Sequence, residues 1–376
     1  MIRNSFKTNT LLLFISLIFV ASCTENNTKE EAINFEELIE FDYAKGLKIY
    51  KTNEGHVVTV LNPMNGETVD HFLVTDKETS NLSDIKIIKT PIRNILAYSS
   101  TYISFIDALG EIEKIKGVTY SQGLYNKKIK EQLASKHTID VGNDQQPDKE
   151  LIVSLHPDVA LIYPSNGNHD WFSSFEIPTI ANVEYQETHP LAQAEWIKLY
   201  GILFDKERIA DSIFNSIKTQ YLAEIVRENE SAKPRVLCGE LYDNVWTLPG
   251  GKSLTAQLIQ DAGADYFYSN DTTTGSKKLD FEYILKNDSG IDYWLLLTYN
   301  NKPVSLQTLQ NKNERYKYLS VFEANKIGVC NTATTPYFEK GLIQPHILLR
   351  EIKSLVKTGN KPDSLVYIKG LNKFYF

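Results

Sequence analysis

Short apolar runs alternate with amphipathic segments along most of the chain. A run of consecutive apolar residues is typical of a strand buried on both faces of a parallel sheet, and the segments between the runs have the apolar spacing of helices. The runs lie at residues 93–99, 112–120, 159–163, 176–183, 235–241, 265–269, 292–299 and 325–331. Because the alternation stops near residue 190 and restarts after Pro234, it predicts two α/β lobes, each built on a doubly wound, mainly parallel sheet.

A long helix is predicted between the two regions of alternation. The large residues that recur every four positions there are Ile209, Ile213, Ile217, Tyr221 and Ile225. This spacing places them on one helical face. A helix over residues 206–227 would be about 33 Å long at 1.5 Å per residue, and the charged segment after it ends at Pro234, which cannot continue a helix. This one long backbone helix is expected to join the two lobes.

The apolar pattern of the N-terminal region has a period of two. Leu47 and Ile49 alternate with polar residues before Asn53-Glu54-Gly55, and Val58 and Val60 do so after it. This alternation around a turn predicts a hairpin with flanking edge strands. A β-rich extension is therefore expected ahead of the first lobe.

The first residues of the chain have a different pattern, with an unbroken apolar run from Leu11 to Val20 behind two basic residues. A run of about ten apolar residues is too short to span a membrane and is typical of a secretory signal peptide. Ala21 and Ser22 then precede Cys23, an order that resembles the lipobox of bacterial lipoproteins. That resemblance implies cleavage before Cys23 and acylation of its thiol and new amino group, which would anchor the chain stably. An ordinary secretory signal with an incidental cysteine is the alternative.

The length and composition suit about two globular domains, since 42% of the 376 residues are hydrophobic and 23% are charged. The predicted segments are a lipoprotein signal peptide (1–22), a tether (23–40), the β-rich N-terminal extension (41–90), an N-lobe (91–190), linking helices (191–233) and a C-lobe (234–376).

The charge balance is acidic, with a formal net charge of −7 that becomes −9 when the signal peptide takes Arg3 and Lys7 with it. An acidic chain is a poor partner for nucleic acids. Beyond Cys23 the chain has Cys238 and Cys330, which are expected at the ends of the first and fourth strands of the C-lobe. With a strand order of 2-1-3-4 they would lie about 9–10 Å apart, beyond the reach of a disulfide. Both are therefore expected as free, buried thiols.

Four segments carry a resemblance to a known family. They are RNILAYSSTYISFIDALGEIEKIKGVTY (93–120), DVGNDQQPDKELIVSLHPDVALIY (140–163), DNVWTLPGGKSLTAQLIQDAGADYFY (243–268) with LDFEYIL (279–285), and YFEKGLIQPHILLREIKSLV (337–356). In their order and spacing, residues 92–357 resemble the helical-backbone (class III) substrate-binding proteins of ABC importers, which bind iron–siderophores, cobalamin and haem. The resemblance implies two Rossmann-like lobes, one ligand cleft between them and a single helix that limits hinge motion.

The same resemblance implies ligand contacts at the carboxyl ends of the strands, in agreement with the general rule for open α/β sheets. The residues that follow the predicted strands are rich in aromatic rings and hydroxyl groups, which suits a large flat or chelate ligand. The candidate ligand-binding residues are Tyr98, Ser99, Ser100, Tyr102, Tyr120, Tyr125, Tyr163, Trp246, Lys252, Tyr299, Tyr337 and Phe338. For each tyrosine, ordinary packing is the alternative. Trp246, beside Gly250-Gly251, is predicted to lie at the rim of the cleft.

Two glutamates are candidates for contact with a membrane permease. Glu150 and Glu282 match the positions where the family has one glutamate on each lobe, and the resemblance implies that they bind arginines of the permease. Such charge-assisted contacts fix an orientation with modest affinity. The alternative is structural, because both glutamates lie in the first turn of a predicted helix, where a negative charge is favoured.

Neither catalysis nor a resident metal or cofactor is expected. The pair His169-Asp170 follows a strand closely enough to reach the cleft, but a lone pair of this kind is interpreted as part of a solvated loop. Gly251-Lys252-Ser253 resembles the end of a phosphate-binding loop, yet Trp246 occupies the position of the required early glycine. Ser99 and Ser100 follow a strand without the flanking glycines of a nucleophile elbow.

The sequence therefore predicts a monomeric substrate-binding protein of the bacterial cell envelope, held by its lipid anchor alone on the periplasmic face or the outer surface. It would capture an iron–siderophore type chelate and deliver it to an ABC permease and its ATPase. Cobalamin, another corrinoid or haem is the alternative ligand, and the segment at 337–341 departs from the cobalamin-binding pattern. A non-transport surface lipoprotein, such as a sensor or adhesion module, is the alternative of another class.

Overall fold

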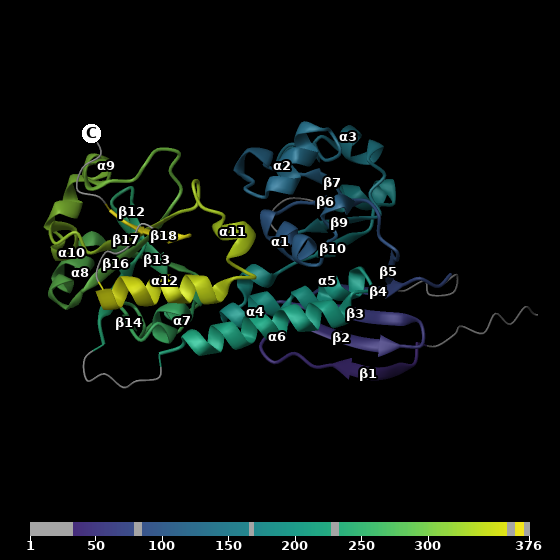
Figure 1. Ribbon diagram of the computed structural model, residues 1–376, viewed down its shortest axis with the longest axis horizontal. Coiled ribbons are helices and arrows are strands. Elements are labelled where there is room, and N and C mark those ends of the chain that lie inside the picture. Colours follow the sequence, from purple (N-terminus) through teal and green to yellow (C-terminus); the bar gives the residue numbers. More distant parts are fainter. Residues whose placement is uncertain (1–32, 79–84, 165–168, 227–232, 359–364, 372–376) are drawn as a thin grey trace, which may run out of the picture.

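The computed structural model describes residues 33–78, 85–164, 169–226, 233–358 and 365–371. Two α/β lobes with mainly parallel sheets and a separate N-terminal β-sheet confirm the predicted class (Figure 1). Helix α6 (Glu207–Glu224) extends from the C-lobe toward the N-terminal sheet along the lower edge of the view (Figure 1). The predicted signal peptide and Cys23 lie outside the described residues.

The N-lobe is built on a five-stranded sheet in which all neighbouring strands are parallel. In spatial order its strands are β10 (Thr179–Ala181), β9 (Val159–Ile162), β6 (Ile95–Ala97), β7 (Ile115–Val118) and β8 (Ile139–Asp140), and its helices are α1 (Ser100–Ala108), α2 (Lys127–Ala134) and α3 (Lys149–Ser154). Every residue of β6 and β9 is buried, which is why both stand out as apolar runs. Sequence reasoning missed α2, because only Ile129 and Gln132 of this polar segment are buried.

The C-lobe sheet has four parallel strands and one antiparallel edge strand. In spatial order they are β14 (Asp265–Tyr266), β11 (Arg235–Cys238), β16 (Tyr293–Thr298), β17 (Ile327–Asn331) and β18 (Ile368–Gly370). The order of the first four confirms the predicted arrangement 2-1-3-4. The unpredicted strand β18 is anchored by the buried Glu351, whose carboxylate accepts from the backbone N–H groups of Val366 (2.6 Å), Tyr367 (2.9 Å) and Ile368 (2.8 Å).

Six helices and a small antiparallel sheet complete the described part of the C-lobe. The helices are α7 (Leu254–Asp261), α8 (Phe281–Lys286), α9 (Leu306–Lys312), α10 (Ser320–Glu323), α11 (Tyr337–Lys340) and α12 (Pro345–Thr358), and the strands are β12 (Glu240–Tyr242), β13 (Val245–Pro249) and β15 (Ser276–Asp280). Asp243 and Asn244 connect β12 to β13 with φ angles of 46° and 66°, the left-handed pair that two-residue hairpins require. Residues 245–249 are therefore a strand, which was not predicted from the sequence.

Helices α4 (Pro190–Glu195) and α5 (Ile197–Leu203) precede α6. The predicted long helix is confirmed over 207–224, whereas Arg227 lies outside the described residues. The last turns of α6 are fastened to the C-lobe: the Tyr221 hydroxyl donates to Asp261 of α7 at 2.6 Å, and Glu224 accepts from Arg350 of α12 at 2.8 Å. Its other end packs against α5.

The N-terminal extension forms a five-stranded sheet whose spatial order follows the chain. Its strands are β1 (Phe35–Ile39), β2 (Leu47–Thr52), β3 (Gly55–Leu61), β4 (Thr68–Thr75) and β5 (Lys86–Lys89). Thr52 pairs with Gly55, which confirms the predicted hairpin. The tether predicted for residues 23–40 is too long, since β1 lies within it and pairs with β2.

A buried carboxylate from the linking helices holds the extension in place. Glu195 is fully buried at the end of α4 and accepts from three successive backbone N–H groups, those of Asp42 (2.9 Å), Tyr43 (2.8 Å) and Ala44 (2.9 Å). The ammonium group of Lys198 lies 2.9 Å from the same carboxylate. A buried charge is tolerated when it is paired and hydrogen-bonded in this way.

A second carboxylate, that of Glu187, binds the next residues of the extension in the same way. Its carboxylate accepts from the backbone N–H groups of Lys45 (2.9 Å) and Gly46 (2.8 Å) and from the indole N–H of Trp196 (3.1 Å). A Cβ atom at Gly46 would lie 2.7 Å from the Trp196 ring, so this close approach requires glycine. The extension is thus an integral layer of the molecule rather than a loosely attached module.

Candidate functional site

Tyrosines gather at the carboxyl edge of the N-lobe sheet, where the sequence predicts ligand contacts. Tyr120 follows β7 and is 54% exposed, and Tyr163 follows β9 and is half-buried. The hydroxyl groups of both donate to the carboxylate of Asp144, in the loop after β8. Since these three residues come from three strand ends, the parallel topology brings them together.

Asp144 was not among the predicted site residues. Partial burial opposes its ionisation, but the hydrogen bonds from Tyr120 and Tyr163 outweigh burial and hold the pKa of Asp144 below its usual value. In turn, the hydrogen bond to Asp144 raises the pKa of Tyr120. The edge therefore presents a carboxylate and two neutral phenols at neutral pH, a set of oxygen atoms that can bind a polar or metal-chelating ligand.

The lowered pKa of Asp144 makes a pH-dependent contribution to stability. A carboxyl whose pKa is lower in the folded state stabilises the fold fully above its unfolded pKa of about 3.9 and loses this contribution as pH falls through the folded value. We expect Asp144→Asn to lower the free energy of unfolding by about 1 kcal/mol at pH 7 and by less at pH 3, since the site is partly exposed. Urea unfolding at both pH values, with Asp211→Asn on the exposed face of α6 as the control, measures this difference. An equal effect of Asp144→Asn at both pH values would contradict the argument.

Tyr98 and His169 form the inner part of this edge. Tyr98, directly after β6, is only 1% exposed, and its ring meets that of His169 edge-on with centroids 5.7 Å apart. Burial raises the pKa of Tyr98 and lowers that of His169. Within the described residues, neither the Tyr98 hydroxyl nor Nε2 of His169 has a hydrogen-bond partner. The interpretation of His169 as part of a solvated loop is therefore wrong, because its ring packs against Tyr98 and Phe172.

The other candidates around α1 have structural roles. Ser99 caps the helix, since its hydroxyl oxygen accepts from the backbone N–H of Thr101 at 3.3 Å, and Ser100 is the half-buried first helical residue. Tyr102 is 1% exposed and packs in the core. Its prediction as a ligand contact is corrected, because α1 turns this side chain inward.

Tyr125 connects the two lobes. Its hydroxyl donates to the backbone carbonyl of Ala333, and its backbone N–H donates to the carboxylate of Glu339 on α11. Helix α11 also contacts α1 (Figure 1). Burial, followed by the nearby Tyr299 and Glu339, raises the pKa of Tyr125. The carboxyl ends of β7 and β17 thus adjoin, with Tyr299 and Phe338 69% and 48% exposed on the C-lobe side.

Trp246 does not lie at a cleft rim. Its side chain is fully buried, the indole N–H donates to the carbonyl of Cys238 at 2.8 Å, and the rings of Trp294 and Tyr316 lie 5.3 and 6.0 Å away. The prediction is wrong because Trp246 belongs to strand β13, which was not predicted and which directs this residue into the C-lobe core.

The glycines after β13 do not form a ligand loop either. The backbone N–H of Gly251 donates to the Asp271 carboxylate at 3.0 Å, and that of Lys252 donates to the Thr273 carbonyl at 2.9 Å. A Cβ atom on Gly250 or Gly251 would lie within 2.3 Å of a backbone oxygen. Both glycines therefore serve close packing against residues 268–275, and Lys252 is an exposed residue before α7. These engaged N–H groups leave no phosphate cradle.

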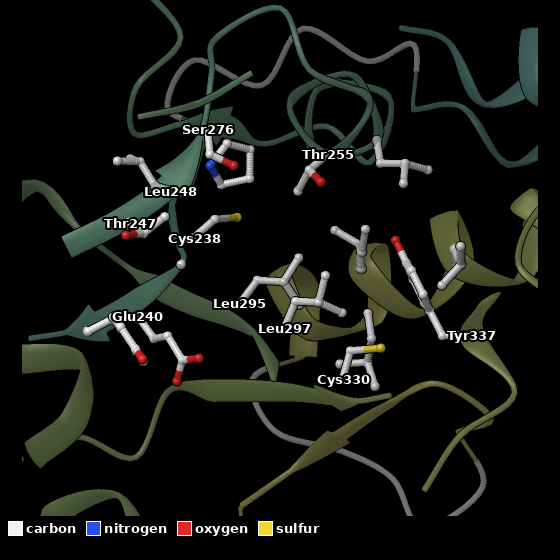
Figure 2. Close-up of a pocket in the computed structure, with 17 residues that line it drawn as sticks. Cys238, Glu240, Thr247, Leu248, Thr255, Ser276, Leu295, Leu297, Cys330 and Tyr337 are labelled. Atoms are coloured by element: carbon white, nitrogen blue, oxygen red, sulfur yellow. The ribbon is translucent and has the colours of Figure 1, made fainter. Parts of the chain in front are cut away.

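A cavity of about 520 Å³ opens in the C-lobe (Figure 2). Leu295 and Leu297 of β16 form its floor, and Tyr337 of α11 stands at one side (Figure 2). The thiols of Cys238 and Cys330 line it from β11 and β17, and both are buried and free. This confirms the predicted state of the two thiols, and burial raises the pKa of Cys330 to about 12. Tyr337 was a predicted site residue, whereas the leucines were not.

Residues 95–319, which include the sheet strands from β6 to β16, match the family model described as "Periplasmic binding protein". The chain belongs to the periplasmic binding protein family. This membership confirms the resemblance recognised in the sequence, and it confirms a binding protein rather than an enzyme. Among sequence relatives, an uncharacterized lipoprotein of Methanocaldococcus jannaschii is 26% identical, with 84% of this chain and 81% of that protein aligned.

Solved structures of this fold superpose on 70–80% of the chain. The petrobactin-binding protein YclQ of Bacillus subtilis aligns over 80% of this chain and 99% of its own, with 16% identity and a TM-score of 0.56. The periplasmic heme-binding protein HutB of Vibrio cholerae aligns over 70% and 98%, with 15% identity and a TM-score of 0.57. An Fe³⁺-hydroxamate transport protein of Saccharomonospora viridis aligns over 71% and 94%, with 16% identity and a TM-score of 0.56. At these identities the likeness establishes the fold.

The two glutamates predicted to contact a permease are both exposed in this periplasmic binding protein. Glu150 lies in the first turn of α3. Glu282 lies in the first turn of α8 and forms an ion pair with Arg315. Each glutamate therefore presents a carboxylate on the surface of its own lobe. A binding partner at Glu282 would have to share this carboxylate with Arg315.

Two further observations concern the described residues of this periplasmic binding protein. No group of three or more His, Cys, Asp or Glu side chains converges there in a manner that could hold a metal ion. In the same residues, no helix combines the length and the apolar character needed to cross a membrane.

Proposed function

We propose that this protein is the substrate-binding component of an ABC importer and that it carries an iron–siderophore type chelate. The observation that carries the proposal is the pairing of two unlike surfaces at adjoining strand ends. The N-lobe edge offers phenols and the Asp144 carboxylate, and the C-lobe offers an apolar cavity beside α11. A chelate has a polar, oxygen-rich centre and an organic periphery, so both surfaces have a counterpart on such a ligand.

The names of the structural relatives support this ligand class. They include proteins that bind petrobactin or heme and one of an Fe³⁺-hydroxamate transport system. Haem is the second candidate, because the Tyr98 hydroxyl and Nε2 of His169, which have no hydrogen-bond partner within the described residues, belong to side chains of the types that ligate haem iron. Cobalamin remains the alternative from the sequence alone, and a non-transport surface lipoprotein remains the alternative of another class.

The delivery step rests on features outside the ligand site. We propose that the lipid-modified Cys23 anchors the chain in the cell envelope and that Glu150 and Glu282 contact a permease. We also propose a division into an extension that includes β1, two doubly wound lobes and linking helices, with the later boundaries at residues 91, 191 and 234. Helix α6 then acts as the single hinge, and closure of the lobes is small because Glu224 and Tyr221 tie its end to α12 and α7.

Ligand binding to the chain that starts at Thr24 tests the function. Coloured iron and corrinoid complexes quench tryptophan emission, and Trp171 of the N-lobe lies two positions after His169 in the chain. With a panel of ferric hydroxamate, ferric catecholate, haem and cobalamin, we expect at least one dissociation constant below about 10 μM. Asp144→Ala should weaken that binding about tenfold, whereas Asp211→Ala on α6 should not. If no compound of the panel binds below about 10 μM, the proposed function is wrong.

A further inference from the structure

The C-lobe cavity lies between the sheet of the lobe and two of the helices that pack near it. Its floor is the sheet, with Cys238, Leu295 and Cys330 on three adjacent strands. Helices α7 and α12 form the opposite wall through Leu258, Leu348 and Ile352. Its volume of about 520 Å³ is within the range of about 300–1,000 Å³ that small-molecule sites occupy. Packed protein cores have few voids larger than a water molecule. A space of this volume is therefore unusual for a core, and it is large enough for a ligand group.

The lining carries little net charge. Among the described residues that line the cavity there is no lysine, arginine or histidine. Glu240 is the one carboxylate among them, and the ammonium group of Lys312, 2.6 Å away, balances its charge. The thiol of Cys330 is neutral, because burial raises its pKa. A charged group would lose its hydration here without a partner, so the cavity favours an uncharged, apolar guest.

The mouth of the cavity lies next to the contact between the lobes. Tyr242 and Leu297 are 68% and 42% exposed and both belong to the lining. Tyr337 of the lining lies on α11, the helix whose Glu339 accepts from the backbone N–H of Tyr125 in the N-lobe. A group that enters the cavity would therefore extend from the place where the adjoining strand ends meet.

We propose that the cavity binds an uncharged aliphatic arm of the carried chelate. This inference rests on the proposed function. It adds an uncharged aliphatic arm to the expected ligand, which binding at the N-lobe edge alone does not require. Leucine, isoleucine and cysteine make up most of the lining and can pack around flexible methylene chains, while Tyr242 of the lining is 68% exposed. The chelate centre would remain outside, near Asp144 and Tyr120, and the arm would enter the C-lobe.

An apolar probe tests the cavity without any chelate. The neutral dye N-phenyl-1-naphthylamine should bind the chain that starts at Thr24 with one saturable site. It should also slow the reaction of Cys238 and Cys330 with N-ethylmaleimide. Leu297→Asp, which places a charge at the mouth, should weaken dye binding about tenfold. Leu285→Asp is the matched control, since Leu285 is 39% exposed on α8 and does not line the cavity. Absence of saturable binding, unprotected thiols, or equal effects of the two substitutions would overturn the proposal.

A pair of chelates connects the cavity to the ligand. N-acetyl and N-decanoyl ferrioxamine B share one iron centre and one neutral amide, and they differ only in the length of one aliphatic arm. We expect the decanoyl derivative to bind about tenfold more tightly, the effect of burying roughly two methylene groups, and the difference to vanish in Leu297→Asp. Equal affinities overturn the inference and leave the proposed function intact. If the dye binds as expected and no chelate of the wider panel binds, the proposed function fails while the apolar site stands.

Discussion

Replacement of Glu195 with alanine is expected to lower the free energy of unfolding by about 3–5 kcal/mol. The substitution removes the acceptor of three backbone N–H groups, of which that of Ala44 is buried and those of Asp42 and Tyr43 are partly buried, and leaves the ammonium group of Lys198 without its partner. Buried donors that lose their acceptor keep their full desolvation cost, which is why the effect exceeds that of one hydrogen bond. Urea denaturation followed by far-UV circular dichroism measures the change.

Loss of stability from Glu195→Ala should be concentrated in the extension. Amide hydrogen exchange is expected to increase most at residues 42–46 and in the adjacent sheet, since their attachment to α4 is removed. Glu131→Ala is the matched control, because the Glu131 side chain is 64% exposed on α2. If Glu195→Ala and Glu131→Ala destabilise the protein equally, the carboxylate does not hold the extension.

The double substitution Glu150→Ala/Glu282→Ala is expected to reduce uptake of the ligand about tenfold while the affinity for the ligand stays within about twofold. Removal of both carboxylates would take away one charge-assisted contact per lobe. Uptake of radioactive iron complex in cells, together with ligand titration of the purified variant, separates delivery from capture.

Two exposed glutamates outside these positions provide the control for delivery. Glu131→Ala/Glu314→Ala removes the same charge from one residue in each lobe, with side chains that are 64% and 83% exposed. Normal uptake with the Glu150/Glu282 pair removed would refute permease docking and favour a surface lipoprotein without a transport role. Because Arg315 already pairs with Glu282, the single substitution Glu150→Ala should have the larger effect of the two.

Most of the sheet architecture could be predicted because several central strands of both lobes are buried on both faces. Residues 159–162 and 327–331 are buried throughout, so each strand appears in the sequence as an apolar run with a helical segment beside it. The same reasoning placed Cys238 and Cys330 on two strands with a third strand between them. The pairing of both β11 and β17 with β16 confirms this arrangement.

The conformation of the segment around Trp246 could not be predicted, because it depends on a contact with Asp271, which is distant in the sequence. Asp271 accepts from the backbone N–H of Gly251, and nothing in the local pattern at 246–254 indicates that contact. The hairpin turn at Asp243-Asn244 did carry a signal, since both residue types tolerate positive φ, and recognition of it would have placed Trp246 in a strand.

Asp144 was missed for a different reason. It lies in a polar loop, where period and propensity carry no information about which side chains converge. Only the parallel order of β7, β8 and β9 around the sheet brings it between Tyr120 and Tyr163. Strand-end tyrosines were identifiable from sequence, but the acid that they share required the structure.

The anchoring of the extension by Glu187 and Glu195 also determines the order in which the chain can fold. The carboxylates lie 141 to 153 positions after the backbone groups that they bind, whereas the hairpin of β2 and β3 is closed by neighbours in sequence. Contacts between distant segments pay the larger entropy of loop closure and form slowly. We therefore expect the hairpin to form early on a growing or translocating chain, and the extension to dock late, although it is synthesised before both lobes.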